Sequence, residues 1–349
     1  RGLQLLCILE RIQRIIQKEP RRVGLSATLG DYELAKNWLS SGTTRKVNLP
    51  DVGTEKRKIK LGVKYFEIED KENGASILDY YKELYEKTLD KKCIIFSNSK
   101  AEVEDTIAHL KKIAKERKTK DIYYVHHANI SNTLRRQAEE QMKQEEENGI
   151  TGATVTLELG IDLGKLDRIV QTGTPFTVSS FVQRLGRSGR RGQPAEMLFF
   201  FKEEVESKPK EFYEQMDFEF IKCIAIIELY LKEKWIEPIE KNTLPFSLLY
   251  HQTMSYLFGM GAVSPKDLAK QILTLSPFKH IEKEDYKELL KYLLQKEEIE
   301  KDEDGNLLIG MKGEKKVNNF QFFSVFSTPI EYSVRNGSQE IGSVQTPYI

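Results

Sequence analysis

Between residues 93 and 201, short apolar runs alternate with longer amphipathic runs, and this alternation limits the possible folds more than any other feature of the chain. Helices are predicted at 77–89, 101–115, 134–147 and 178–188, and strands at 93–96, 122–125, 153–155, 167–171 and 195–201. Nearly continuous apolar strands separated by helices are typical of a parallel sheet covered on both faces. We therefore expect an α/β fold with a doubly wound parallel sheet.

The stretches on either side of this alternation have different patterns. Residues 3–18 predict an amphipathic helix, and the apolar runs 22–29, 45–49 and 59–68 predict strands. From about residue 208 helical patterns dominate, and Asp304-Gly305 then lies between two short apolar runs, as in a hairpin turn. Helices followed by such a hairpin predict a winged helix. A polar break at 69–75 suggests a linker, and residues 320–349 predict further strands.

Composition excludes several classes of protein. The formal net charge is +1, so nucleic acid would have to bind at local basic clusters rather than in a global positive field. A transmembrane helix needs about 20 apolar residues in a row, and no such run occurs, so nothing should span a membrane and we expect no membrane partner. Cys7, Cys93 and Cys223 are far apart, form no CxxC pair and fit core positions in a reducing cytoplasm. We expect no metal site.

The most specific segment is 183–192, which reads QRLGRSGRRG. Arg184, Arg187 and Arg191 recur at helical spacing, so we expect them to share one face of a helix that runs to about residue 188. A guanidinium is planar, permanently charged and suited to phosphate oxygens, and a cluster of them normally needs an anion to offset its repulsion. A solvated basic turn is the alternative interpretation.

Two further polar segments follow predicted strands. Segment 154–164 places Asp162 between two glycines, where its carboxylate could accept a hydrogen bond from a ribose hydroxyl or orient an arginine; an ordinary turn is an equally good interpretation. Ser26-Ala27-Thr28 is weaker, and taken alone it is better explained as a helix-capping turn. In doubly wound sheets, functional residues lie in the loops after the carboxyl ends of the strands, where these polar clusters are expected.

Taken in order, these segments resemble the second half of superfamily 2 helicases. Residues 26–28 resemble motif III, 96–99 motif IV, 154–164 motif V and 183–190 motif VI. Residues 126–131 with Arg135-Arg136, and Leu157-Glu158-Leu159-Gly160-Ile161-Asp162, are similar to the large helicase-related (Lhr) family, as is the predicted winged helix. Members of this family are ATP-dependent motors that move on single-stranded DNA and unwind duplexes, including DNA–RNA hybrids.

The resemblance implies a division into domains. Residues 1–70 would be the end of a first RecA-like domain, and 71–207 a second RecA-like domain. Residues 208–315 would be a winged-helix domain, and 316–349 the start of a β-rich domain. The chain would thus be a C-terminal fragment whose first RecA-like domain belongs to the same polypeptide. Neither the phosphate loop GxxxxGK[ST] nor a set of magnesium-binding acids is found here, so we expect no ATP hydrolysis by this chain alone.

The resemblance also implies roles for single residues, with ATP and Mg²⁺ as cofactors and single-stranded DNA or a DNA/RNA duplex as partner. The expected catalytic residues are Arg187 and Arg190, and the expected nucleotide contacts are Gly160, Asp162, Gln183 and Arg184. The expected nucleic-acid contacts are Ser97, Asn98, His127 and Thr156, and the expected coupling residues are Ser26 and Thr28. A structural histidine held by hydrogen bonds is as good an interpretation of His126 and His127.

Two rival functions stay open from sequence. One is a non-catalytic nucleic-acid-binding protein that keeps a helicase-like shell, and the other is the helicase subunit of a restriction or defence system. An intact arginine segment argues against the first, and a nuclease partner would favour the second.

Overall fold

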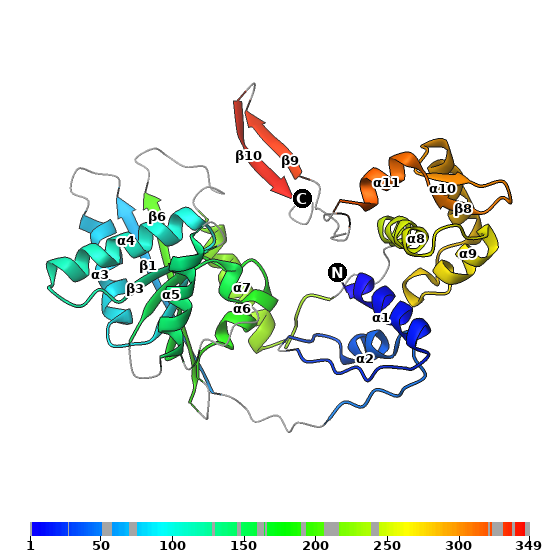
Figure 1. The fold of residues 1–349 in the computed structure, drawn as a ribbon. Coiled ribbons are helices and arrows are strands. Elements are labelled where there is room, and N and C mark those ends of the chain that lie inside the picture. Colours follow the sequence, from blue (N-terminus) through cyan, green and yellow to red (C-terminus); the bar gives the residue numbers. More distant parts are fainter. Residues whose placement is uncertain are drawn as a thin grey trace. The chain divides into compact units, whose positions relative to one another are not determined.

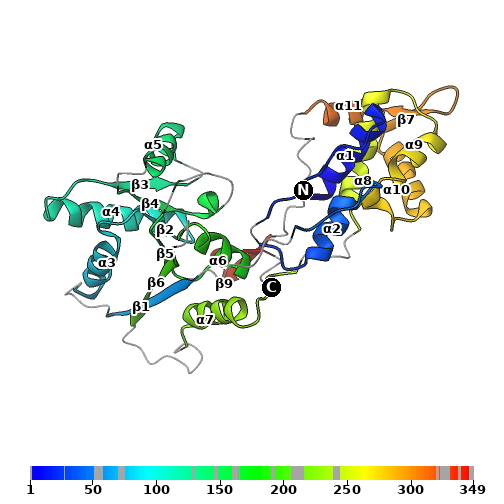
Figure 2. The ribbon, with the colours of Figure 1, turned by 90° about the horizontal axis from the view of Figure 1, so that it is seen from below.

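The computed structural model describes residues 2–26, 28–50, 58–69, 75–127, 130–144, 148–158, 164, 166–189, 193–205, 216–238, 244–319, 322, 331–336 and 339–345, and the structural statements below concern these residues. They fall into two compact units (Figures 1 and 2). Unit 1 comprises 1–24, 33–49 and 239–349, and unit 2 comprises 25–32 and 50–238. Each unit is described by itself.

Unit 2 is built on a six-stranded sheet in the order β1-β6-β5-β2-β4-β3, and every neighbouring pair is parallel. The strands are β1 (Ile59–Glu69), β2 (Cys93–Phe96), β3 (Tyr123–His126), β4 (Ile150–Ala153), β5 (Arg168–Thr172) and β6 (Ala195–Val205). Helices α3 (Ala75–Thr88), α4 (Lys100–Glu116), α5 (Asn132–Lys143) and α6 (Val178–Leu185) lie between the strands in sequence, and α7 (Phe218–Leu231) follows the last strand. The predicted doubly wound parallel sheet is confirmed.

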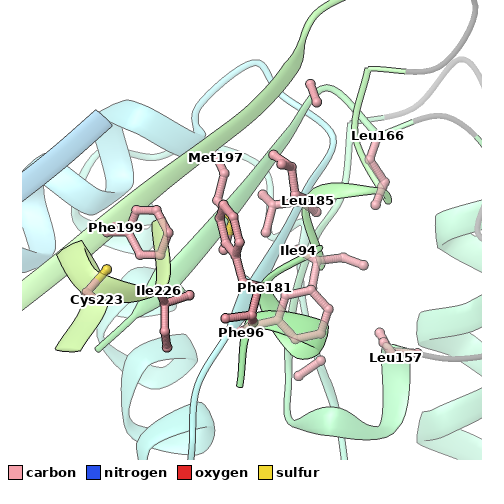
Figure 3. Close-up of a cluster of buried hydrophobic side chains, with 14 of the residues drawn as sticks. Ile94, Phe96, Leu157, Leu166, Phe181, Leu185, Met197, Phe199, Cys223 and Ile226 are labelled. Atoms are coloured by element: carbon pink, nitrogen blue, oxygen red, sulfur yellow. The ribbon is translucent and has the colours of Figure 1, made fainter. Parts of the chain in front are cut away.

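The core of unit 2 has two layers because side chains alternate along each strand. On β2, Ile94 and Phe96 join a cluster with Phe181 of α6 and Ile226 of α7 (Figure 3). Cys93 and Ile95 join the opposite cluster, to which α3 and α4 contribute. Gly152 on β4 lets α4 come close, because an added Cβ would lie 2.6 Å from Ile107. Burial on both sheet faces explains why the strands read as continuous apolar runs.

Unit 1 is mainly helical, with a core that includes Cys7 of α1 (Gly2–Ile16) and Leu249 of α8. Its other helices are α2 (Tyr32–Ser40), α8 (Phe246–Met260), α9 (Pro265–Leu273), α10 (Lys283–Gln295) and α11 (Met311–Val317), with a 3₁₀ turn at Ser276–Phe278. The predicted hairpin is present as β7 (Ile299–Lys301) and β8 (Leu307–Ile309), and Gly305 has φ +81° in its turn. A second hairpin pairs β9 (Glu331–Asn336) with β10 (Gln339–Gln345). The winged-helix assignment stays a prediction.

Residues 1–70 do not pack as the one domain that we expected. In unit 1, buried Glu10 of α1 accepts a hydrogen bond from the amide of Ser276 at 3.0 Å, so the N-terminal helix is tied to the 3₁₀ turn that follows α9. Strand β1 instead pairs with β6 over 11 residues, so the sheet of unit 2 begins before residue 71. The boundary predicted at 70/71 is therefore wrong.

The strands predicted at 22–29 and 45–49 are also absent from the described residues of those segments. Val23 is 75% exposed and Leu25 is 94% exposed, so neither joins a core. An apolar run forms a strand only where a neighbouring strand offers backbone hydrogen bonds, and no described strand pairs with either segment.

The three cysteines are free and buried, as predicted. Burial raises the pKa of the Cys7 and Cys223 thiols to about 12, so both are inert at neutral pH. None of the described helices is long and apolar enough to cross a membrane. Within the described ranges, no three histidine, cysteine, aspartate or glutamate side chains gather in a way that could hold a metal ion.

His251 predicts a pH dependence of the stability of unit 1. It is 3% exposed on α8, and burial lowers the pKa of its imidazole below the ordinary value of 6.5. The unfolded chain therefore binds a proton more readily, so the free energy of unfolding should fall as the pH drops below about 6.5. Urea unfolding of wild type and His251→Gln at pH 7 and pH 5 measures this, and an equal loss of stability in both proteins would contradict it.

Candidate nucleotide and nucleic-acid site

Helix α6 carries the arginine segment and is fixed at both ends. Thr177, in extended conformation, caps its start by accepting a hydrogen bond from the Ser180 amide at 3.0 Å. The helix ends at Leu185, and Gly186 follows as its C-cap. The helix is thus shorter than predicted, because the chain turns at Gly186, and Arg187 lies beyond its last residue. The expected single helical face is therefore wrong for Arg184 and Arg187, and Arg191 lies outside the described residues.

Arg184 points into the core of unit 2 and is fully buried. Its Nε donates to Oε1 of Glu158 at 2.6 Å, its Nη1 donates to the side-chain oxygen of Gln171, and its guanidinium lies 4.8 Å from the ring centre of Phe96. Burial lowers the pKa of Arg184, and the charge of Glu158 opposes this. An arginine stays protonated in such a setting. Arg184 thus contacts the 154–164 segment and has no exposed surface, and its predicted nucleotide contact stays a prediction.

Glu158 is the residue that sequence reasoning overlooked. Besides holding Arg184, its Oε2 accepts a hydrogen bond from the hydroxyl of Ser180 at 3.2 Å, and its backbone carbonyl accepts one from Nη2 of Arg187 at 2.6 Å. One residue after the turn Val155–Leu157 therefore fixes both arginines. Its only signal in the sequence is an acidic side chain within the 154–164 segment, which also contains Asp162.

The side chain of Gln183 on α6 contacts that of Thr28, and both are partly buried. Nε2 of Gln183 donates to the hydroxyl of Thr28 at 3.4 Å and to the hydroxyl of Ser179 at 3.0 Å. Exposed Ser26 accepts a hydrogen bond from the Thr28 amide at 3.2 Å. The structure thus brings the Ser26–Thr28 segment and the arginine segment together within unit 2. It leaves Arg187 and Gln183 partly exposed.

Three predicted site residues, Gly160, Asp162 and Arg190, lie outside the described residues. Gly189 has φ +66°, and a Cβ added there would lie 2.4 Å from the carbonyl oxygen of Pro194. The close contact with the backbone of Pro194 therefore requires glycine at position 189, and no bound anion is needed to explain this residue.

The predicted nucleic-acid contacts divide into two pairs. Ser97 is 1% exposed and accepts a hydrogen bond from Thr172 at 2.8 Å, and His127 is 3% exposed with its Nε2 2.8 Å from Glu104. Both side chains are engaged by neighbouring residues, as the structural interpretation of a histidine expects, and their nucleic-acid contacts stay predictions. His126 likewise lies 2.9 Å from Thr156 and 3.0 Å from Glu139.

Asn98 and Thr156 are partly exposed. Nδ2 of Asn98 donates to the Thr174 carbonyl at 2.8 Å, whereas its Oδ1 has no hydrogen-bond partner. The hydroxyl of Thr156 donates to the His126 carbonyl at 3.3 Å. Asn98 follows β2 and Thr156 follows β4, so both lie at the carboxyl edge of neighbouring strands, where doubly wound sheets bind their ligands.

Comparison with known proteins relates the part of the chain that holds this site to helicases. Residues 76–192 match the helicase conserved C-terminal domain. The chain is 28% identical over 303 residues to the ATP-dependent helicase Lhr-Core of Methanothermobacter thermautotrophicus. This match covers 84% of this chain and 33% of that protein. It is 32% identical over 197 residues to Lhr-Core protein 2 of Thermococcus barophilus, covering 55% of this chain and 22% of that protein.

A solved structure agrees in fold. Mycobacterium smegmatis helicase Lhr, bound to single-stranded DNA and AMP-PNP, has a TM-score of 0.70 at 23% identity, over 90% of this chain and 40% of that one. The chain spans about a third of the length of the first of the curated relatives above. Residues 76–192 are thus a helicase C-terminal domain with a RecA-like fold. Beyond this domain, the chain is similar to Lhr helicases over most of its length.

Proposed function

We propose that this chain is part of an ATP-dependent nucleic-acid helicase or translocase in the cytoplasm, and that it supplies an arginine to the nucleotide site. The observation that carries this is the placement of Arg187, which is partly exposed while a buried ion pair, Arg184 with Glu158, anchors the helix before it. Hydrogen-bond donors that are already held in place stabilise the charge that develops in a transition state most effectively, because they need no rearrangement.

ATP and Mg²⁺ would supply the phosphoryl group and neutralise part of its charge. Of the residues described, Arg187 and Gln183 fit such a ligand because they are partly exposed on one segment, and Arg184 does not because it is enclosed. Arg190, Gly160 and Asp162 stay part of the proposal on resemblance alone. Arg187 would donate hydrogen bonds to phosphate oxygens. Gln183 would link the nucleotide to Thr28, a residue proposed to couple the ATP state to the grip on nucleic acid. A phosphate loop would have to come from a first RecA-like domain of the same polypeptide.

Single-stranded DNA or a DNA/RNA duplex would cross the carboxyl edge of the sheet at Asn98 and Thr156. Contacts there through an amide and a hydroxyl would go to phosphates, which carry no sequence information and suit a motor. The M. smegmatis relative is bound to single-stranded DNA in its solved structure, which supports a nucleic-acid ligand for this chain.

ATP hydrolysis tests the proposal. A polypeptide that joins this chain to a first RecA-like domain should hydrolyse ATP, and single-stranded DNA or RNA should stimulate it. Residues 1–349 alone should not hydrolyse ATP and should bind it poorly. Nucleic-acid binding without any turnover by the joined polypeptide would instead favour a non-catalytic binding protein.

A further inference from the structure

A carboxylate from outside the sequence motifs is bound at the start of α6. Oε1 of Glu237 accepts a hydrogen bond from the Val178 amide at 2.6 Å, and Oε2 accepts one from the Ser179 amide at 2.9 Å. Thr177 takes the next amide, that of Ser180. The first turn of α6 is therefore saturated, and a negative charge at this end also interacts favourably with the helix dipole.

The same turn of α6 holds a second segment of chain. The hydroxyl of Thr28 lies 3.5 Å from the hydroxyl of Ser179. It also accepts a hydrogen bond from Nε2 of Gln183, one turn further along α6, at 3.4 Å. Segment 28–30 also packs on the residue before Glu237, since a Cβ added at Gly30 would lie only 3.2 Å from the Ile236 carbonyl oxygen. Segments 28–30 and 236–237 and the first turn of α6 therefore contact one another in all three pairings.

Both held segments are places where the chain passes between the two units. Residues 25–32 belong to unit 2 although residues 24 and 33 belong to unit 1, and Pro238 is the last residue of unit 2 before the chain returns to unit 1. We propose that Glu237 is a positioning residue, which clasps these two connecting segments to the helix that leads into the arginine segment. Its carboxylate orients α6 and Thr28 without touching nucleotide or nucleic acid.

The coupling role of this clasp rests on the proposed function, whereas the clasp itself can be tested without activity. In Glu237→Gln the side chain keeps its size but turns an NH₂ group toward one of the two amides. In residues 1–349, amide hydrogen exchange should then rise by about fivefold, the effect of losing a helix cap, both at 178–180 and at 28–30. Faster exchange at 178–180 alone would reduce Glu237 to an ordinary helix cap and overturn the proposal.

Asp217→Asn is the matched control, because Asp217 caps α7 of the same unit by accepting from the Phe220 amide at 2.9 Å. It should leave exchange at 28–30 unchanged. In the joined polypeptide, Glu237→Gln should lower the ratio of nucleic-acid-stimulated to basal ATP turnover about fivefold with an unchanged KM for ATP, whereas Asp217→Asn should not. An unchanged ratio would overturn the coupling role. A wild-type polypeptide without turnover would contradict the proposed function, and the exchange experiment would still decide the clasp.

Discussion

Glu158→Ala should lower the free energy of unfolding of unit 2 by about 3–5 kcal/mol, because it leaves the guanidinium of Arg184 buried without its partner. Arg184 is fully buried and Glu158 is 9% exposed, so little water can replace the lost carboxylate. The substitution also removes the acceptor of the Ser180 hydroxyl. Urea unfolding followed by circular dichroism measures the loss.

A second ion pair of unit 2, between strands β5 and β6, provides the control for this prediction. Arg168 and Glu196 are 2.7 Å apart, but their side chains are 14% and 26% exposed. Water can reach that pair, so Glu196→Ala should cost about 1 kcal/mol or less. Combining Glu158→Ala with Arg184→Met should recover part of the stability, because no buried charge is then left unpaired. Equal losses from Glu158→Ala and Glu196→Ala would refute the anchoring role of Glu158.

Arg187→Ala in the joined polypeptide should lower ATP turnover by about 10³ to 10⁵-fold, the range found when nucleotide hydrolases lose such an arginine. Nucleic-acid binding should weaken only modestly, because Arg187 would face the nucleotide rather than the strand. Folding should be little affected, since Arg187 is partly exposed and donates a hydrogen bond to a backbone carbonyl, that of Glu158. Melting temperature and single-stranded DNA binding therefore belong beside the turnover measurement.

Much of unit 2 could be predicted from the sequence, because its buried strands are composed mainly of apolar residues. The strand 93–96 and the start of α6 at Val178 lie where they were predicted. Hydrophobic periodicity is local, so it finds elements that pack on both sheet faces. It could not show that segment 22–29 lacks a strand to pair with, because pairing depends on what the rest of the chain brings alongside.

The candidate site was less predictable because its contacts join distant residues. An arginine is expected at the surface, and only the partner 26 residues earlier in the chain explains the burial of Arg184. Glu237 belongs to no motif and lies 59 residues from the amide of Val178 that it caps. The arginine motif itself was visible, but the sequence could not show which arginine anchors the segment and which stays open to a ligand.

Steady-state ATP turnover with single-stranded DNA, measured for Arg187→Ala beside Arg117→Ala, tests most directly whether this chain contributes an arginine to catalysis. Arg117 lies at the end of α4, pairs with Glu86 on the surface and serves as the matched control. We predict near-normal turnover for Arg117→Ala and almost none for Arg187→Ala, with both proteins folded and bound to DNA. Normal turnover in Arg187→Ala would contradict the account.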